Sequence, residues 1–187
     1  MGRGWVSVLV GLTLVLSGCS GSTSDQPKVL PPVVTPSASP SVASTASPVP
    51  VVVPSAAAAA TPQGAAAFVR FFFDEVNGAF QDGRSERIRV LADASCATCN
   101  NFANAVRAAE KTDSRIVGTS FASLEVESEP PKGGLAHVTV AGTIPARQSK
   151  DRGVVSTLPA LGRFIYSVEI QRNGDGWLIR EIRIEKS

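Results

Sequence analysis

Proline is unevenly distributed along this chain, and that distribution limits what the chain can fold into. Nine of the 13 prolines in the 187 residues lie before residue 63. From residue 20 to residue 63 there is no aromatic side chain, and Asp25 and Lys28 are the only charges. Such a segment cannot bury enough apolar surface to offset the entropy lost on ordering. We therefore predict a disordered, proline-stiffened linker over residues 19–63 and a folded domain over residues 64–187.

The first 20 residues have the pattern of an export signal. Arg3 precedes an apolar run from Val6 to Leu16, which is shorter than the roughly 20 residues of a membrane span. The run ends in Leu-Ser-Gly-Cys19, which resembles the bacterial lipobox. That resemblance implies removal of a lipoprotein signal peptide over residues 1–18 and acylation of Cys19. Two or three acyl chains hold a domain at a bilayer more firmly than one.

Lipidation of Cys19 predicts a cell-membrane location, with the domain on the extracytoplasmic side. The alternative is an uncleaved amino-terminal helix in which Cys19 is incidental. The Ser/Thr/Pro composition of the linker is also typical of O-glycosylated stalks.

Three helices are predicted at the start of the domain. The first begins after Pro62 and carries its apolar residues on one side, at helical spacing. Arg70, Asp74 and Asn77 lie on the opposite side, and Phe71 falls outside the apolar stripe, where it contacts the linker, a partner or solvent. The stripe consists of Ala65, Phe68, Val69, Phe72, Phe73, Val76 and Phe80.

Asp82-Gly83 ends the first helix, and Ser85 caps a short second helix that turns Ile88 and Leu91 inward. A third helix is expected over residues 95–111.

Four strands follow, because the apolar spacing changes from helical to alternating. Residues 122–126 and 138–144 form one predicted hairpin, and residues 164–170 and 177–184 form another across Asn-Gly-Asp-Gly. Residues 147–153 are expected to be a charged loop. This order favours an α+β fold in which three helices pack on one curved, four-stranded antiparallel sheet.

Two groups of residues suggest a known fold. The Phe-rich stretch at residues 66–73 and the closing Asn-Gly-Asp-Gly-Trp-Leu-Ile at residues 173–179 are similar to the nuclear transport factor 2-like (cystatin-like) superfamily. With Ser-Cys-Ala-Thr-Cys at residues 95–99, the same stretch resembles an actinobacterial lipoprotein family of unassigned function. The resemblance implies a cone-like domain. That superfamily includes enzymes, ligand binders and interaction modules, so the fold does not select a function.

Cys96 and Cys99 form a Cys-x-x-Cys pair at the start of the third predicted helix. A thiol at a helix amino terminus has a lowered pKa, which suits redox chemistry. The pair does not follow a βαβ unit, however, and in an exported protein neighbouring thiols become oxidised. We favour a structural disulfide, with redox activity and zinc binding as alternatives. His137 is too distant in sequence to complete a zinc site, and its alternation with Val138 turns it toward solvent.

Three polar residues are candidates for lining a pocket. If the last hairpin pairs Ile170 with Leu178, Arg180 lies among apolar residues on the inner face, near the core-facing Tyr166. A buried guanidinium requires an anion, either an acidic ligand or a carboxylate such as that of Glu75. A slip of one residue in the pairing would place Arg180 outside.

The composition restricts the functional classes. Residues 64–187 carry 16 Lys/Arg and 15 Asp/Glu, which gives no basis for nucleic-acid binding. No catalytic triad, phosphate loop or metal cluster is evident, so no cofactor is expected and an enzyme is disfavoured. We predict a lipid-anchored binding or interaction module that recognises an envelope protein or a small ligand. The alternatives are a small enzyme with a cavity lined by Tyr166, Arg180 and a first-helix carboxylate, and a structural envelope protein that dimerises through its sheet.

Overall fold

The structure is a computed structural model, and it describes residues 50–185. The predicted signal peptide, Cys19 and the linker up to residue 49 lie outside the described residues. The helices are α1 (Ser55–Ala58), α2 (Pro62–Asp82), α3 (Glu86–Arg89) and α4 (Ala97–Lys111). The strands are β1 (Ser114–Val117), β2 (Ala122–Ser128), β3 (Leu135–Ile144), β4 (Arg147–Asp151), β5 (Val154–Leu158), β6 (Gly162–Asn173) and β7 (Gly176–Ile184).

Helix α2 is the central helix of the domain, and local signals define both its ends. The Thr61 hydroxyl accepts a hydrogen bond from the Gly64 N–H at 3.0 Å, and Pro62 occupies the first turn. The helix ends at Gly83, which is left-handed (φ 82°) and donates to the Ala79 carbonyl at 2.8 Å. Apart from Phe80, which is half-buried, the predicted apolar stripe is buried.

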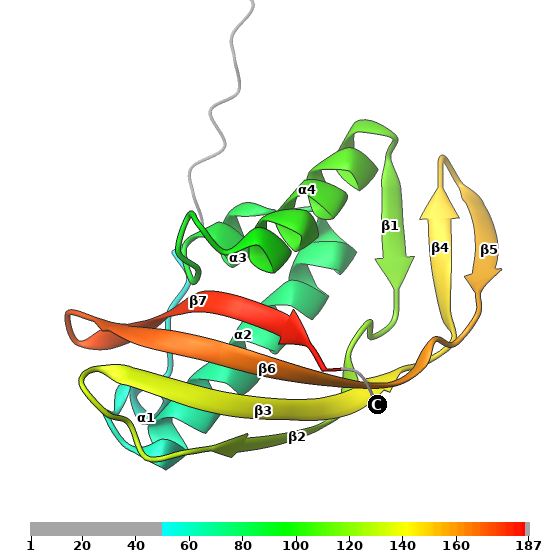
Figure 1. The fold of residues 1–187 in the computed structure, drawn as a ribbon. Coiled ribbons are helices and arrows are strands. Elements are labelled where there is room, and N and C mark those ends of the chain that lie inside the picture. Colours follow the sequence, from blue (N-terminus) through cyan, green and yellow to red (C-terminus); the bar gives the residue numbers. More distant parts are fainter. Residues whose placement is uncertain (1–49, 186–187) are drawn as a thin grey trace, which may run out of the picture. The chain divides into compact units, whose positions relative to one another are not determined.

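The strands form two antiparallel sheets, which differs from the single predicted sheet. The larger sheet has the order β2-β3-β6-β7 and contains the four predicted strands, with helices on one face (Figure 1). The smaller has the order β1-β4-β5. The predicted charged loop at residues 147–153 is mostly strand β4, and the domain has four helices where three were predicted. The class α+β is confirmed, but the single-sheet architecture is wrong.

The hairpin β4–β5 interrupts a longer hairpin. Strands β3 and β6 pair along their length, from Leu135 opposite Gln171 to Ile144 opposite Gly162. The chain between them forms β4 and β5, which extend beyond the end of the larger sheet (Figure 1). Strand β1 pairs with β4 and completes the smaller sheet.

Aromatic side chains fill the space between α2 and the larger sheet. Phe73 packs edge-on against Phe72 and Phe121, with ring centroids 5.5 and 5.2 Å away, and stacks on Tyr166 at 6.0 Å. Phe164 lies 4.6 Å from Tyr166 by the same measure. Such offset and edge-to-face pairs stabilise a core beyond the area they bury.

The domain begins earlier than the predicted boundary at residue 64. Residues 50–63 were assigned to the linker, but in the structure α1 packs against α2 and Ala57 is buried. Arg172 donates from Nη1 to the Ala58 carbonyl at 2.6 Å, which ties α1 to the end of β6. The valine, alanine and proline side chains of residues 50–63 bury little area by themselves. This segment is therefore ordered only through contacts with distant residues.

Candidate functional site: a groove between α2 and β2

Four polar residues form a stripe along α2 that faces the segment leading into β2. Arg70, Asp74, Asn77 and Gln81 are spaced by three or four residues, which places them on one side of the helix. Arg70 donates from Nη1 to the Leu124 carbonyl at 2.8 Å, and Gln81 donates from Nε2 to the Gly118 carbonyl at 3.0 Å. The stripe therefore satisfies backbone groups beside the edge of the larger sheet.

Asn77 is the buried member of this stripe. Its side-chain oxygen accepts from the N–H groups of Ser120 and Phe121 at 3.0 and 2.8 Å, and its Nδ2 donates to the Phe121 carbonyl at 3.0 Å. Only 9% of Asn77 is exposed, so the side of α2 opposite the apolar stripe is itself partly buried. The sequence does carry a signal for this contact, because polar residues recur along α2 at i, i+4, i+7 and i+11, counted from Arg70.

Asp74 differs from the other three members. Arg70, Asn77 and Gln81 each bond to the backbone of residues 118–124, whereas no hydrogen bond or ion pair to Asp74 is found within residues 50–185. Asp74 is exposed overall, but partial desolvation of its carboxyl raises the pKa, and the nearby Arg70 guanidinium offsets this only in part. A carboxylate in this setting gains from a donor or cation supplied by a ligand.

Two hollows open on either side of Asp74, and both are lined by Arg70 and Asp74. One, of about 480 Å³, is mainly apolar and also contacts Pro54, Ala57, Phe71 and Val126. The other, of about 630 Å³, is more polar and also contacts Asn77, Gln81, Thr119 and Ser123. We call the two hollows together the α2–β2 groove. Phe71, which lies outside the apolar stripe of α2, forms part of the apolar wall of this groove.

The three candidate pocket residues lie in three different environments. Tyr166 is buried among phenylalanines, and burial raises the pKa of its hydroxyl. Glu75 accepts a hydrogen bond from Arg87 Nη1 at 2.9 Å. Phenylalanine rings pack around Tyr166, whereas Glu75 is paired with Arg87.

Arg180 lies outside the core because the predicted register of the last hairpin is wrong. Ile170 is opposite Ile179 rather than Leu178, and Glu169 is opposite Glu181. Arg180 is therefore the extra residue of a β-bulge, exposed, with Nη1 3.8 Å from Oε1 of Glu169. The bulge lets Trp177, Ile179 and Ile182 all be buried, which strict alternation forbids.

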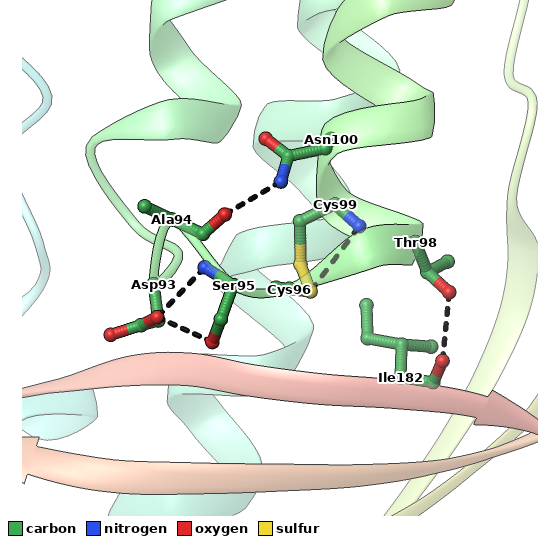
Figure 2. Close-up of a disulfide and its surroundings, with 8 residues drawn as sticks. All are labelled: Asp93, Ala94, Ser95, Cys96, Thr98, Cys99, Asn100 and Ile182. Carbon is green, nitrogen blue, oxygen red and sulfur yellow. Dashed lines mark hydrogen bonds between the residues drawn. A yellow bond between two sulfur atoms is a disulfide. The ribbon is translucent and has the colours of Figure 1, made fainter.

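Cys96 and Cys99 form the expected disulfide, which lies where α4 begins (Figure 2). Cys96 is the N-cap residue, and its sulfur accepts from the Cys99 N–H at 3.2 Å. Just before it, Asp93 accepts from the N–H and hydroxyl of Ser95 at 2.8 and 2.6 Å, which lowers the pKa of that carboxyl. The turn into α4 is thus held by a covalent bond and local hydrogen bonds.

The segment that leads into the disulfide covers the edge of β7. The Asp93 N–H donates to the Ile179 carbonyl at 2.8 Å, and the Ile179 N–H donates to the Leu91 carbonyl at 3.0 Å. Thr98 donates to the Ile182 carbonyl at 2.8 Å (Figure 2). The two cysteines are only 1% and 2% exposed, whereas redox catalysis requires an accessible thiol. The geometry favours the structural interpretation over the redox alternative.

The larger sheet presents a polar face away from the helices. Glu127, Thr139, Ser167 and Arg183 follow one another across its four strands, and His137 is exposed opposite Glu169. This face lacks the broad apolar surface that the structural alternative, a dimer formed through the sheet, would need.

Residues 50–185 contain neither a metal-binding cluster nor a membrane-spanning helix. No group of three or more His, Cys, Asp or Glu side chains is arranged to hold a metal ion. No helix in that range has the length and apolar character needed to cross a membrane.

Solved structures similar to this domain include proteins described as NTF2-like or cystatin-like. The intermembrane space region of the chloroplast protein ARC6 is 14% identical, with a TM-score of 0.50 over 67% of this chain and 97% of that chain. An NTF2-like protein of unknown function from Pseudomonas putida KT2440 is 12% identical (TM-score 0.40; 68% and 89% covered). A protein with a cystatin-like fold from Caulobacter vibrioides is also 12% identical (TM-score 0.40; 63% and 87% covered). At these identities the likeness concerns the fold alone.

The sequence itself identifies the family. Residues 37–150, more than half of the chain, match the family of unknown function DUF6318, and the chain belongs to this family. The resemblance expected from the sequence to a family without an assigned function is confirmed, and structures described as NTF2-like or cystatin-like are among the similar ones. No curated protein sequence matches the chain.

Proposed function

We propose that this protein is a lipid-anchored binding module of the bacterial cell envelope. Acylated Cys19 holds it in the membrane, the proline-rich segment spans the distance from the bilayer, and the domain binds a partner in the α2–β2 groove. The sequence around Cys19 supports the anchor, and the composition of residues 20–49 supports the spacer.

Asp74 carries the argument for binding. It is the one residue of the α2 stripe whose side chain is not engaged by residues 118–124, and hollows lie on both sides of it. A ligand that places an ammonium or guanidinium group on Asp74 would form charge-assisted hydrogen bonds with its exposed carboxylate. The apolar hollow beside Phe71 suits a neighbouring aliphatic side chain. The groove is therefore suited to a basic side chain flanked by apolar residues in an extended peptide.

The binding proposal can be tested with two short capped peptides and the full chain in detergent micelles. One peptide has the sequence Val-Lys-Val, and the other replaces lysine with uncharged norleucine. Saturation-transfer NMR should detect binding of the lysine peptide, weakened at least fivefold by Asp74→Asn. Glu110→Gln, which removes an exposed carboxylate on α4, is the matched control and should have no effect. Equal binding of both peptides, or binding indifferent to Asp74, would contradict the proposal.

The anchor requires a separate test. Cells that produce the protein should incorporate labelled palmitate into it, and Cys19→Ser should abolish the label. Absence of label in the unmodified protein would remove the anchor from the proposal and leave the binding groove.

A further inference from the structure

Strand β5 differs from the other outer strands because its edge is uncovered. The edge of β2 lies beside the polar stripe of α2, and the edge of β7 is covered by residues 91–93. Strand β1 lies against α2 and α4. Among residues 50–185 no helix packs against β5, whose residues are exposed except for the half-buried Leu158. An uncovered sheet edge offers unpaired N–H and C=O groups to another strand.

The sequence of β5 does not protect this edge. Residues 153–162 contain no charged side chain, although edge strands are usually protected by lysine, inward-pointing charge or bulges. Val154, Val155 and the nearby Leu161 are 69%, 54% and 68% exposed. Exposed valines on both faces of an uncharged edge strand favour pairing with a further strand.

The turn before β5 determines which backbone groups point outward. Arg152 and Gly153 both have positive φ, 46° and 88°, as in a two-residue hairpin turn of type I′. Asp151 and Val154, which flank this turn, are directly opposite each other. In a two-residue hairpin the pair that flanks the turn is a hydrogen-bonded one. Bonding alternates along an antiparallel pair, so the N–H and C=O groups of Val155 and Thr157 point away from β4.

We propose that β5 pairs with β5 of a second copy of this chain, antiparallel and centred on Ser156. This register places Val155 opposite Thr157 of the second copy, and these are the residues with outward-pointing backbone groups. The two-fold symmetry gives four backbone hydrogen bonds, and Val154 lies opposite Leu158 of the second copy. No charged residue lies opposite another, and the symmetric contact leaves no open edge at β5.

The contact between the two β5 strands is small, so the dimer it forms is weak. Pairing of two five-residue strands buries less than the roughly 1,200–2,000 Å² of a stable interface. The dimer is therefore weak and forms where copies are concentrated. This inference does not depend on the α2–β2 groove.

Disulfide crosslinking of the full chain in the membranes of producing cells tests the register. In this arrangement Ser156→Cys places two thiols directly opposite each other, with Cα atoms about 4.5 Å apart, within the range of a disulfide. Copper phenanthroline should then give a band of twice the chain mass on a non-reducing gel. Val155→Cys is the matched control, because its two copies are diagonal, with Cα atoms about 7–8 Å apart, and should crosslink at least fivefold less. The unmodified chain, which also contains Cys19, gives the background.

A second substitution distinguishes crosslinking between paired β5 strands from crosslinking by random collision of two chains. Thr157→Pro removes an outward-pointing N–H without removing a bond to β4, a position where an edge strand tolerates proline. Added to Ser156→Cys, it should reduce the dimer band at least tenfold, whereas Thr157→Val should leave it unchanged. Equal crosslinking at positions 155 and 156, no dimer band, insensitivity to Thr157→Pro, or a product with another protein would each overturn the proposal.

Discussion

Trp177 donates a hydrogen bond from its indole Nε1 to the carbonyl oxygen of Ala59 at 3.0 Å, joining two residues that are 118 positions apart in the chain. The Arg172 guanidinium lies 5.0 Å from the centre of the Trp177 ring and bonds to the carbonyl of Ala58. The last hairpin of the domain thus fixes the segment that precedes α2. Residues near the end of the chain determine where the domain begins.

Two glycines of α2 provide a test of this packing. A Cβ at Gly64 would lie 2.2 Å from the Ala59 carbonyl oxygen, so Gly64→Ala must displace the segment that Trp177 holds. We expect a loss of about 1–3 kcal/mol in the free energy of unfolding, as for other overpacked sites. Gly78→Ala is the matched control, because its nearest neighbour is the end of Arg87 at 3.5 Å. Removing a mid-helix glycine there should stabilise by about 0.5–1 kcal/mol. Urea unfolding followed by tryptophan fluorescence measures both, and equal effects at the two sites would refute the packing argument.

The sequence predicts the elements whose side chains have one buried face. The stripe of α2 and the alternation in β2, β3, β6 and β7 are produced by packing on the core, and these elements lie near the predicted positions. Strands β4 and β5 lack this signal because β4 contains no apolar side chain and β5 is mostly exposed. They are strands because of backbone pairing, which leaves no apolar pattern.

The candidate site was less predictable than the fold. The misplacement of Arg180 comes from a bulge, which adds one residue and reverses the alternation beyond it. The groove at Asp74 depends on residues 118–124, and nothing local in α2 specifies that they lie there. Spacing together with the predicted export favours the Cys96–Cys99 bond, because both residues belong to one turn and thiols outside the cytoplasm become oxidised.

Asn77 should be the polar residue on which the α2–β2 contact depends most. Asn77→Ala removes partners from two N–H groups and one carbonyl in a buried position, at 2.8–3.0 Å. Leaving such groups unsatisfied costs about 1–3 kcal/mol each, so we expect a loss of roughly 2–4 kcal/mol. Asn101→Ala, at an exposed position on α4, should change the free energy of unfolding by less than about 0.5 kcal/mol. Thermal and urea unfolding of the two variants give the comparison, and similar values would contradict the role assigned to Asn77.

The disulfide should stabilise the covering of β7. Chain-entropy arguments give about 2 kcal/mol for so short a loop. Reduction, or the double change Cys96→Ser and Cys99→Ser, should therefore accelerate hydrogen exchange of the Asp93 and Ile179 amides, which bond across this edge. Amides at the centre of the larger sheet, such as Val138 and Val168, serve as internal controls and should change less. Uniform acceleration throughout the domain would mean that the bond acts on global stability alone.

Two aspartates should shift stability with pH in opposite directions. The pKa of Asp74 is raised by burial, so the folded state holds its proton more tightly than the unfolded state. Stability from this group falls as the pH rises from 3.8 through the raised pKa, and Asp74→Asn should stabilise the protein at neutral pH. Asp93 is the reverse case. The pKa of its carboxyl is lowered by hydrogen bonds from Ser95, so its contribution is present above 3.8 and is lost as the pH falls through the lowered pKa.

Urea midpoints of Asp74→Asn and Asp93→Asn, measured from pH 2 to 7, provide the comparison. The difference from the unmodified protein should be positive for Asp74→Asn, negative for Asp93→Asn, and near zero for both at the lowest pH. Carbon-13 chemical shifts of the two carboxyl groups check the cause, since Asp74 should titrate above 3.8 and Asp93 below it. The same sign for both variants at neutral pH would show that one of the two carboxyl environments is misassigned. A normal titration of Asp74 would also weaken the case that its carboxylate lacks a partner in the groove.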